Sequence, residues 1–301
     1  MAEPRYRDII DDWEAFVAAS ERPLPTTIWA NPLKVTPAEL EAHLTAQSIP
    51  FEPLSWRAGA YRLPDTPRPG SRLGYLAGLF HVQEEVSMLP VELLDIRPGQ
   101  RVLDACAAPG NKTAQIATRL GDRGTLIAND YNYRRMKSVV RTLERLGILN
   151  TAICTHDAAN FPNDLGTFDR VLADVPCSCE GTSRKHGVSP ATARDFHNLC
   201  GTQLAILGKA LTLCRPGGRV VYATCTYAPE ENETIVDEAL RQFRGQVELL
   251  PAKIPGFPAS KGLVEWRGQR FDSTLERALR VYPHHHDTGG FFLALFEKVA
   301  S

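Results

Sequence analysis

The stretch RVLDACAAPGNKT, residues 101–113, decides the fold of this chain. Its first four residues have the pattern of a strand, a turn of small residues follows, and the last residues begin a helix. A strand, a glycine-containing turn and a helix in this order start the repeating unit of a parallel sheet. Backbone amides at such a turn can contact a ligand. We therefore predict that a ligand binds to Cys106, Ala107, Ala108, Pro109, Gly110, Asn111 and Lys112.

The alternation of strands and helices continues to the end of the chain. Strands are predicted at 125–129, 151–155, 170–174, 219–223 and 290–297, and helices near 112–120, 132–146, 190–214 and 230–243 separate most of them. This order predicts an α/β fold, a doubly wound and mostly parallel Rossmann-like sheet, for residues 71–301. Residues 1–70 contain several proline-rich breaks and no such unit. We predict a small separate N-terminal α+β domain there.

The composition is that of an ordinary globular protein. The 301 residues are 43% hydrophobic and 23% charged, with a formal net charge of −1. No stretch has the apolar length of a secretory signal or a membrane span, so we expect a cytoplasmic protein. A near-zero net charge gives no overall attraction for nucleic acid, and a solvated face is the commoner role of isolated basic patches. Two such patches are Arg134, Arg135, Lys137, Arg141 and Arg145, and Arg184, Lys185 and His186.

The seven cysteines lack the paired spacings of a disulfide framework, which predicts free thiols. Cys177 and Cys179, with Cys154 and His156, come nearest to a metal-binding pattern. Their spacing is not that of zinc sites, and we predict no metal.

Two of the thiols follow predicted strands. Cys177 comes after the strand at 170–174, and Cys225 comes after the strand at 219–223. If these strands are neighbours in a parallel sheet, both thiols lie over the same crevice. One thiol could then attack a substrate while the other assists.

Acidic residues follow the strands after the glycine turn, with Asp130 after the second, Asp157 after the third and Asp174 at the end of the fourth. One such acid usually caps a helix, but a series in register with the turn favours a bound nucleoside, whose ribose hydroxyls would donate to Asp130. The turn matches neither G-x-G-x-x-G nor the phosphate-loop motif, which disfavours a dinucleotide or a nucleoside triphosphate. S-adenosylmethionine carries a ribose, an adenine and a carboxylate without a polyphosphate. We predict that it binds to the turn and to Asp130, Arg135, Asp157, Asp174 and Pro176.

Three segments resemble the signature motifs of a known family. They are DACAAPGNKT at 104–113, DVPCSCEGT at 174–182 and YATCTYAPEENE at 222–233. Over nearly its whole length the chain resembles the NOL1/NOP2/Sun family of RNA cytosine-5 methyltransferases. Among bacterial members, the order of segments is most similar to the catalytic part of the RsmF group, which acts on 16S rRNA. We expect the extra C-terminal RNA-binding domain of that group to be absent.

The resemblance implies a role for each catalytic residue. In the family a cysteine thiolate adds to carbon 6 of a cytosine, and carbon 5 then takes a methyl group from S-adenosylmethionine. The resemblance assigns the attack to Cys225, release of the product to Cys177 and a hydrogen bond to ring nitrogen 3 to Asp174. The target base must leave the helical stack, because the faces of a paired cytosine are covered. RNA contacts are expected at Asn31, Lys34, Arg184, Lys185 and His186.

Two residues depart from the family pattern. Trp29 stands where the family usually has an arginine, and could stack on a base instead. Cys179 replaces a usual glycine. It could form a reversible disulfide with a catalytic cysteine, although a spectator role is the simpler interpretation.

The favoured substrate is ribosomal RNA, with tRNA second. We expect the protein to be a monomer that needs no protein partner. Two rival functions stay open. One is an RNA-binding ribosome-assembly factor with a degenerate methyltransferase fold. The other is a DNA cytosine-5 methyltransferase, in which the Pro-Cys cysteine is the nucleophile.

Overall fold

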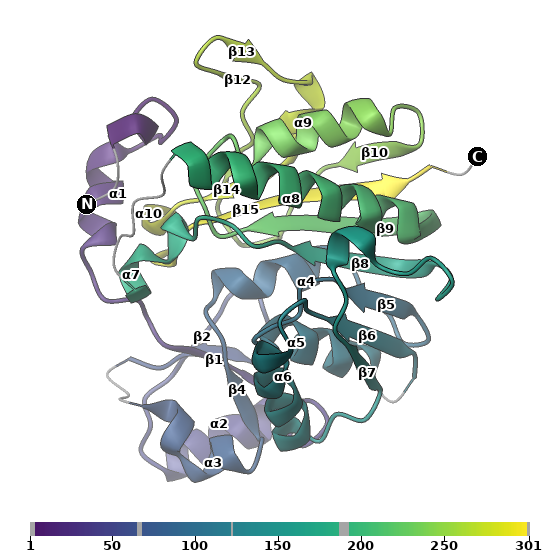
Figure 1. Cartoon of the computed structure of the whole chain (residues 1–301). Coiled ribbons are helices and arrows are strands. Elements are labelled where there is room, and N and C mark those ends of the chain that lie inside the picture. Colours follow the sequence, from purple (N-terminus) through teal and green to yellow (C-terminus); the bar gives the residue numbers. More distant parts are fainter. Residues whose placement is uncertain (1–3, 65–67, 122, 187–192, 300–301) are drawn as a thin grey trace.

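A nine-stranded sheet forms the centre of the molecule (Figure 1). The computed structural model describes residues 4–64, 68–121, 123–186 and 193–299. The strand order is β11-β14-β15-β9-β8-β5-β6-β7, and β10 also pairs with β15. The strands are β5 (Arg101–Asp104), β6 (Thr125–Asn129), β7 (Thr151–Cys154), β8 (Phe168–Asp174), β9 (Cys214–Thr224), β10 (Val247–Leu250), β11 (Ser260–Lys261), β14 (Leu279–Val281) and β15 (Phe291–Lys298).

The sheet has a parallel half and an antiparallel half. β5 to β9 pair in parallel, in the arrangement predicted from the sequence. β15 returns antiparallel to β9, and β10, β14 and β11 continue that side with antiparallel pairing. The predicted α/β class is therefore confirmed, and the sheet as a whole is mixed.

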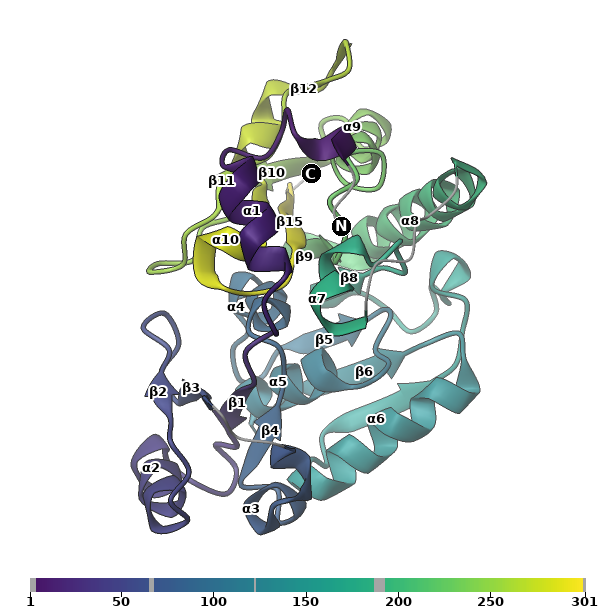
Figure 2. The same ribbon diagram turned by 90° about the vertical axis from the view of Figure 1, so that its left-hand side faces the viewer.

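Helices cover both faces of the sheet (Figure 2). Neighbouring residues of β5 show the alternation, because Val102 packs in one apolar cluster and Leu103 in the other. The first cluster includes residues of α4 (Leu89–Leu93), α5 (Asn111–Leu120) and α6 (Tyr133–Leu146). The second includes residues of α8 (Ala193–Leu213) and α9 (Glu233–Gln242). Both sides of each central strand are buried, which explains their nearly continuous apolar sequences.

A four-stranded antiparallel sheet precedes the large one. Its order is β2-β3-β1-β4, made of β1 (Thr27–Ala30), β2 (Glu52–Pro53), β3 (Ala60–Arg62) and β4 (Phe80–Val82). The helix α2 (Pro37–Ala46) begins at a capping box formed by Thr36 and Glu39, and packs Leu40 and Leu44 into the core of this unit. Residue 70, the predicted end of the N-terminal domain, lies between β3 and β4 of this one sheet.

Short elements complete the chain. They are α1 (Trp13–Ser20), which packs against α10 (Pro283–His286), α3 (Leu73–Leu76), α7 (Ser183–His186) and the hairpin of β12 (Glu265–Trp266) and β13 (Gln269–Arg270). The helix α4 begins one residue before Pro90, which fits the first turn of a helix. No helix among the described residues is long and apolar enough to cross a bilayer. All seven cysteines are thiols, as predicted.

A buried ion pair fixes the segment between β9 and α9. Arg280 of β14 donates to both carboxylate oxygens of Glu233, the first residue of α9, and also to the carbonyl of Tyr227, at 2.9 Å. The two charged side chains are 2% and 0% exposed. A different path for this segment would separate the two side chains and leave a charge buried and unpaired. The pair therefore fixes how the segment leaves the sheet.

We expect Arg280→Met to lower the free energy of unfolding by about 3–5 kcal/mol, the usual cost of an unpaired buried charge. Lys261→Met is the matched control, because Lys261 and Glu276 form an ion pair at 3.5 Å with both side chains exposed. It should cost less than about 1 kcal/mol. Urea unfolding followed by circular dichroism measures both values, and equal losses would contradict the assignment.

Candidate active site

Cys177 and Cys225 meet where two neighbouring strands end. β8 and β9 pair in parallel with Asp174 opposite Ala223, so the segments that follow them leave the sheet side by side. The two Sγ atoms are 3.3 Å apart, and the backbone N–H of Cys225 donates to Sγ of Cys177, also at 3.3 Å. The two strands are therefore neighbours, the condition on which the predicted meeting of the two thiols depended.

Both thiols hold their protons in this arrangement. Hydrogen bonds with Cys179 and Cys225, together with burial, raise the pKa of Cys177 well above its usual value. The contact with Cys177 lowers the pKa of Cys225, but the contact with Cys179 and burial outweigh it, and this pKa is raised as well. A nucleophilic thiolate therefore requires removal of a proton from the pair.

The loop that carries Cys177 rests on a buried glutamate. Glu231 is fully buried and accepts from the backbone N–H of Ser178 at 2.9 Å and from the side-chain amide of Gln203 at 2.8 Å. That amide also donates to the carbonyl of Pro176, at 2.9 Å. Tyr222 of β9 donates to the carbonyl of Glu231 at 2.6 Å. This network positions the loop on β8 against the segment after β9, and the sequence analysis missed it.

Lys112 and Asp174 form an ion pair beside the thiols. Nζ of Lys112 donates to Oδ2 of Asp174 at 2.7 Å and lies 5.2 Å from the centre of the Phe291 ring. Burial by itself would lower the pKa of Lys112, but attraction to Asp174 and their hydrogen bond raise it overall. The lysine of the turn is therefore charged, and it fixes the carboxylate that the resemblance places against the cytosine.

A cavity of about 700 Å³ opens beside this pair. Nine of the predicted catalytic and cofactor residues line it: Cys106, Ala108, Asp130, Arg135, Asp157, Asp174, Pro176, Cys177 and Cys225. Other residues of the turn have structural contacts. Lys112 acts through Asp174, and Asn111 bonds to His81 at 2.9 Å.

Part of the cavity lining was not predicted. It includes Thr202 and Ile206, which are one turn apart on α8, together with the exposed Tyr131 and the buried Val175. In the sequence these four residues look like ordinary residues of a core or of a helix surface. Nothing there marks them as part of a ligand site.

S-adenosylmethionine fits the groups around this cavity. A volume of this size suits a small-molecule site. Asp130 is nearly buried, and backbone N–H groups of Ala108 and Asn132 fix its carboxylate, at 3.2 and 2.9 Å, where it can accept from ribose hydroxyls. Arg135 donates to the carbonyl of Ala108 at 2.7 Å and supports the same turn. Asp157 caps a short 3-10 helix by accepting from Ala159 at 3.0 Å, and it also lines the cavity.

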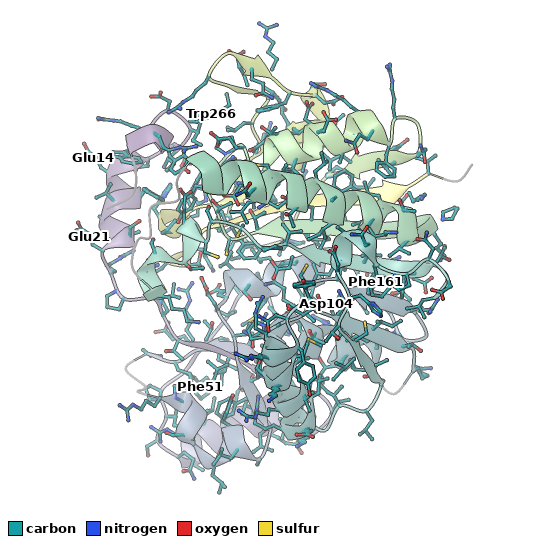
Figure 3. The ribbon with its side chains drawn as sticks, viewed as in Figure 1. Glu14, Glu21, Phe51, Asp104, Phe161 and Trp266 are labelled. Carbon is teal, nitrogen blue, oxygen red and sulfur yellow. The ribbon has the colours of Figure 1, made fainter. Side chains whose placement is uncertain are left out.

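Asp104 lies in the interior at the end of β5 (Figure 3). Its Oδ2 accepts from the hydroxyl of Thr113 at 2.7 Å, whereas Oδ1 is buried without a partner among the described residues. Burial, and repulsion from Asp174 and Asp130, raise its pKa to about 7. This carboxyl consequently binds a proton at a pH where an exposed aspartate is ionised.

Three of the expected RNA contacts form hydrogen bonds within the protein, and of these Lys34 is exposed. Asn31 is fully buried and donates to the carbonyls of Gly78 and Leu146, each at 2.9 Å, so it has no surface to offer a nucleic acid. Lys34 donates to two backbone carbonyls, those of Ala77 and Arg145, at 2.8 and 3.0 Å. Both residues attach the N-terminal unit to the end of α6.

Arg184 and Trp29 are also directed inward. The side chain of Arg184 is 1% exposed and donates to Asp287 and to the carbonyls of Arg22, Pro23 and Thr288. Trp29 is 1% exposed and donates to Gln83 at 2.8 Å, which corrects the idea that it stacks on a base. Lys185 is exposed, and the side chain of His186 lies outside the described residues.

Sequence comparisons agree with this geometry. A profile of the family described as 16S rRNA methyltransferase RsmB/F matches residues 91–297, and a profile described as the N-terminal domain of 16S rRNA methyltransferase RsmF matches residues 4–85. The chain belongs to the RsmB/F methyltransferase family. The methyl donor of this family is S-adenosylmethionine, the cofactor predicted from the sequence.

Relatives with names or structures extend this result. The ribosomal RNA small subunit methyltransferase F of Erwinia tasmaniensis is 35% identical over 97% of the chain, which spans 61% of that protein. The multisite-specific tRNA:(cytosine-C(5))-methyltransferase of Saccharomyces cerevisiae is 38% identical over 72% of the chain, with 38% of its own length matched. A crystal structure of a methyltransferase homologue from Pyrococcus horikoshii is similar to this chain, with a TM-score of 0.85 and 33% sequence identity. The match covers 95% of this chain and 90% of the chain in that crystal structure.

The proton on Asp104 leads to a pH prediction. The carboxyl of Asp104 releases its proton near pH 7 in the folded protein and near pH 4 in the unfolded chain. Between these two pH values the folded state therefore binds one proton that the unfolded state does not. Stability contributed by this group therefore falls as the pH rises from about 4 to 7. Asp104→Asn should remove that fall, measured by urea unfolding at each pH. The exposed-site control Asp164→Asn should leave it in place, and an unchanged slope in Asp104→Asn would contradict the prediction.

Asp130 should be needed for cofactor affinity. We expect Asp130→Ala to weaken S-adenosylmethionine binding at least about tenfold, because a hydrogen bond to a charged group contributes about 1.5–3 kcal/mol. Calorimetric titration gives the dissociation constant, and the thermal midpoint shows whether the variant is folded. The control Asp164→Ala removes an exposed carboxylate on another loop and should bind as the unchanged protein does. Equal affinity in Asp130→Ala and this control would remove Asp130 from the site.

Proposed function

We propose that this protein transfers a methyl group from S-adenosylmethionine to carbon 5 of a cytosine in RNA. The observation that carries the proposal is the pair of thiols 3.3 Å apart at the carboxyl ends of β8 and β9, beside a cavity lined by acidic strand ends. The relatives named above support the substrate class, but the chain spans only part of each curated one.

The thiol pair matches the chemistry that carbon 5 requires. Carbon 5 of cytosine is a weak nucleophile until a thiolate adds to carbon 6 and directs the electrons of the ring double bond to carbon 5. S-adenosylmethionine supplies the electrophilic methyl group. Loss of the proton from carbon 5 and breakage of the sulfur–carbon 6 bond then restore the double bond and the free cysteine.

The resemblance gives the two cysteines unequal roles in this scheme. Cys225 forms and loses the bond to carbon 6, while Cys177 assists release of the methylated base. The resemblance gives Asp174, which is bonded to the charged Lys112, the role of holding the proton at ring nitrogen 3. Because both thiols start protonated, binding of the substrate must be coupled to removal of one proton from the pair.

The RNA surface differs from the one expected at first. We infer that Asn31, Lys34 and Arg184 position the protein framework, since all their named contacts are internal. Exposed cations remain at Lys185 and on α6. Exposed tyrosines lie just before α6, where one lines the cavity, and at its first residue. These residues are Tyr131, which precedes α6, and Tyr133, Arg134, Lys137 and Arg141 of α6. Cations that contact phosphates and aromatic rings that stack on bases are the two components of single-stranded RNA binding.

Ribosomal RNA is the favoured substrate class, because two family profiles are named for 16S rRNA enzymes. A tRNA is the second candidate, supported by the yeast relative. Bisulfite sequencing of total RNA with and without the protein distinguishes these targets, and finds none if the protein is an assembly factor. A cytoplasmic monomer with an N-terminal RNA-binding domain remains the predicted form.

The two cysteine variants test the chemistry. We expect Cys225→Ala to abolish methylation, with a loss of at least about a thousandfold in rate, because the covalent step is removed. Cys177→Ala should accumulate a covalent RNA adduct that survives denaturing electrophoresis. Cys200→Ser is the control, since this thiol bonds to the carbonyl of Glu230 away from the pair.

Reversed results would favour the DNA-type mechanism. If Cys177→Ala is inactive without an adduct and Cys225→Ala stays active, the Pro-Cys cysteine is the nucleophile. Full activity of both variants would contradict the proposal altogether.

A further inference from the structure

A third thiol joins the catalytic pair. Sγ of Cys177 lies 3.3 Å from Sγ of Cys225 and 4.0 Å from Sγ of Cys179, and all three sulfurs lie within 4.8 Å of one another. They come from two strand ends that are far apart in the sequence. The pattern Cys177-x-Cys179 with Cys154 and His156 gave no metal prediction, but the fold supplies Cys225 in place of those residues.

The spacing suits one tetrahedral ion. Zinc binds thiolates at about 2.3 Å in tetrahedral geometry, which separates two ligand sulfurs by about 3.8 Å. The separations of the Cys177 sulfur from those of Cys225 and Cys179, 3.3 and 4.0 Å, lie on either side of this value. Small rotations of the side chains would therefore be enough to bring the three sulfurs around an ion, with no movement of the strands.

The backbone around the three thiols is already fixed. Cys179 adopts the left-handed conformation, with φ 60° and ψ 22°, and the N–H of Thr182 donates to its carbonyl at 2.9 Å. The N–H of Gly181 donates to the carbonyl of Cys225, also at 2.9 Å, which joins the two loops. Cys179 is exposed, so an ion can reach the site from solvent.

We propose that Cys177, Cys179 and Cys225 form a binding site for Zn²⁺ or a similar thiophilic d¹⁰ cation, with a water molecule as fourth ligand. Each thiol that binds the ion loses its proton to solvent, so binding strengthens as the pH rises. An ion bound to Cys225 occupies the sulfur that would attack cytosine. The site is then a reversible inhibitory site, and this consequence, unlike the binding itself, rests on the proposed function.

Cadmium is the probe for the site, since Cd²⁺ has the same preference for thiolates and its bonds to sulfur absorb in the ultraviolet. The full chain is titrated with Cd²⁺ without oxygen, in a phosphine reductant, and without RNA or S-adenosylmethionine. We expect one strongly bound ion with a thiolate-to-metal absorption band. Cys179→Ser and Cys179→Gly should weaken this binding at least about tenfold, because each removes one of three ligands.

Cys154→Ser is the matched control, because this half-buried thiol contacts Asn129 outside the cluster. It should bind Cd²⁺ as the unchanged chain does. Unchanged affinity and absorption in both Cys179 variants would overturn the proposal.

Inhibition is measured separately from binding. Zinc should inhibit methylation by the unchanged chain at concentrations at least about tenfold lower than those that inhibit Cys179→Gly. The rate of each protein is compared with the rate of the same protein in a chelator. Equal zinc sensitivity would contradict the inhibitory role. If no methylation is found at all, the proposed function fails, whereas the cadmium titration still decides whether the site exists.

Discussion

The register between β8 and β9 is the constraint on which the site depends. Asp174 lies opposite Ala223, and each strand delivers a cysteine within three residues of this pair. A shift of one residue moves a strand by about 3.3 Å and turns its side chains to the other face. Because the two sulfurs are themselves only 3.3 Å apart, such a shift would separate them. The fold therefore determines the chemistry through one parallel pairing.

Register alone does not position the loops beyond the strands. Buried charges do this, with Glu231 under the loop of Cys177 and the pair of Glu233 and Arg280 under the segment after Cys225. A buried carboxylate with a missing partner is costly, so a different loop conformation would leave a charge unsatisfied. The acidic residues of the third motif thus have a structural function beside Cys225.

Much of this arrangement could be predicted from the sequence. The apolar strands, the glycine turn and the acids at strand ends are local patterns, and the thiol pair needed only one assumption, that their strands are neighbours. The inward direction of Asn31 and Arg184 could not be predicted in the same way. Asn31 bonds to Leu146 and Arg184 to Asp287, partners more than a hundred residues away. A polar residue in a motif is compatible with either an RNA phosphate or a distant backbone carbonyl, and only the fold decides between them.

The electrostatics of the cavity extend the argument to its ligand. Three acidic side chains line it, those of Asp130, Asp157 and Asp174, and two cations lie in or beside it, Lys112 and Arg135. Burial, and repulsion from Asp174 and Asp130, raise the pKa of the neighbouring Asp104 to about 7, so this carboxyl adds only part of a negative charge near neutral pH. A site with this excess of negative charge attracts a cationic ligand and opposes a polyphosphate. The glycine turn by itself indicated only that no phosphate motif was present. The acids around it supply a physical reason why a sulfonium compound is favoured.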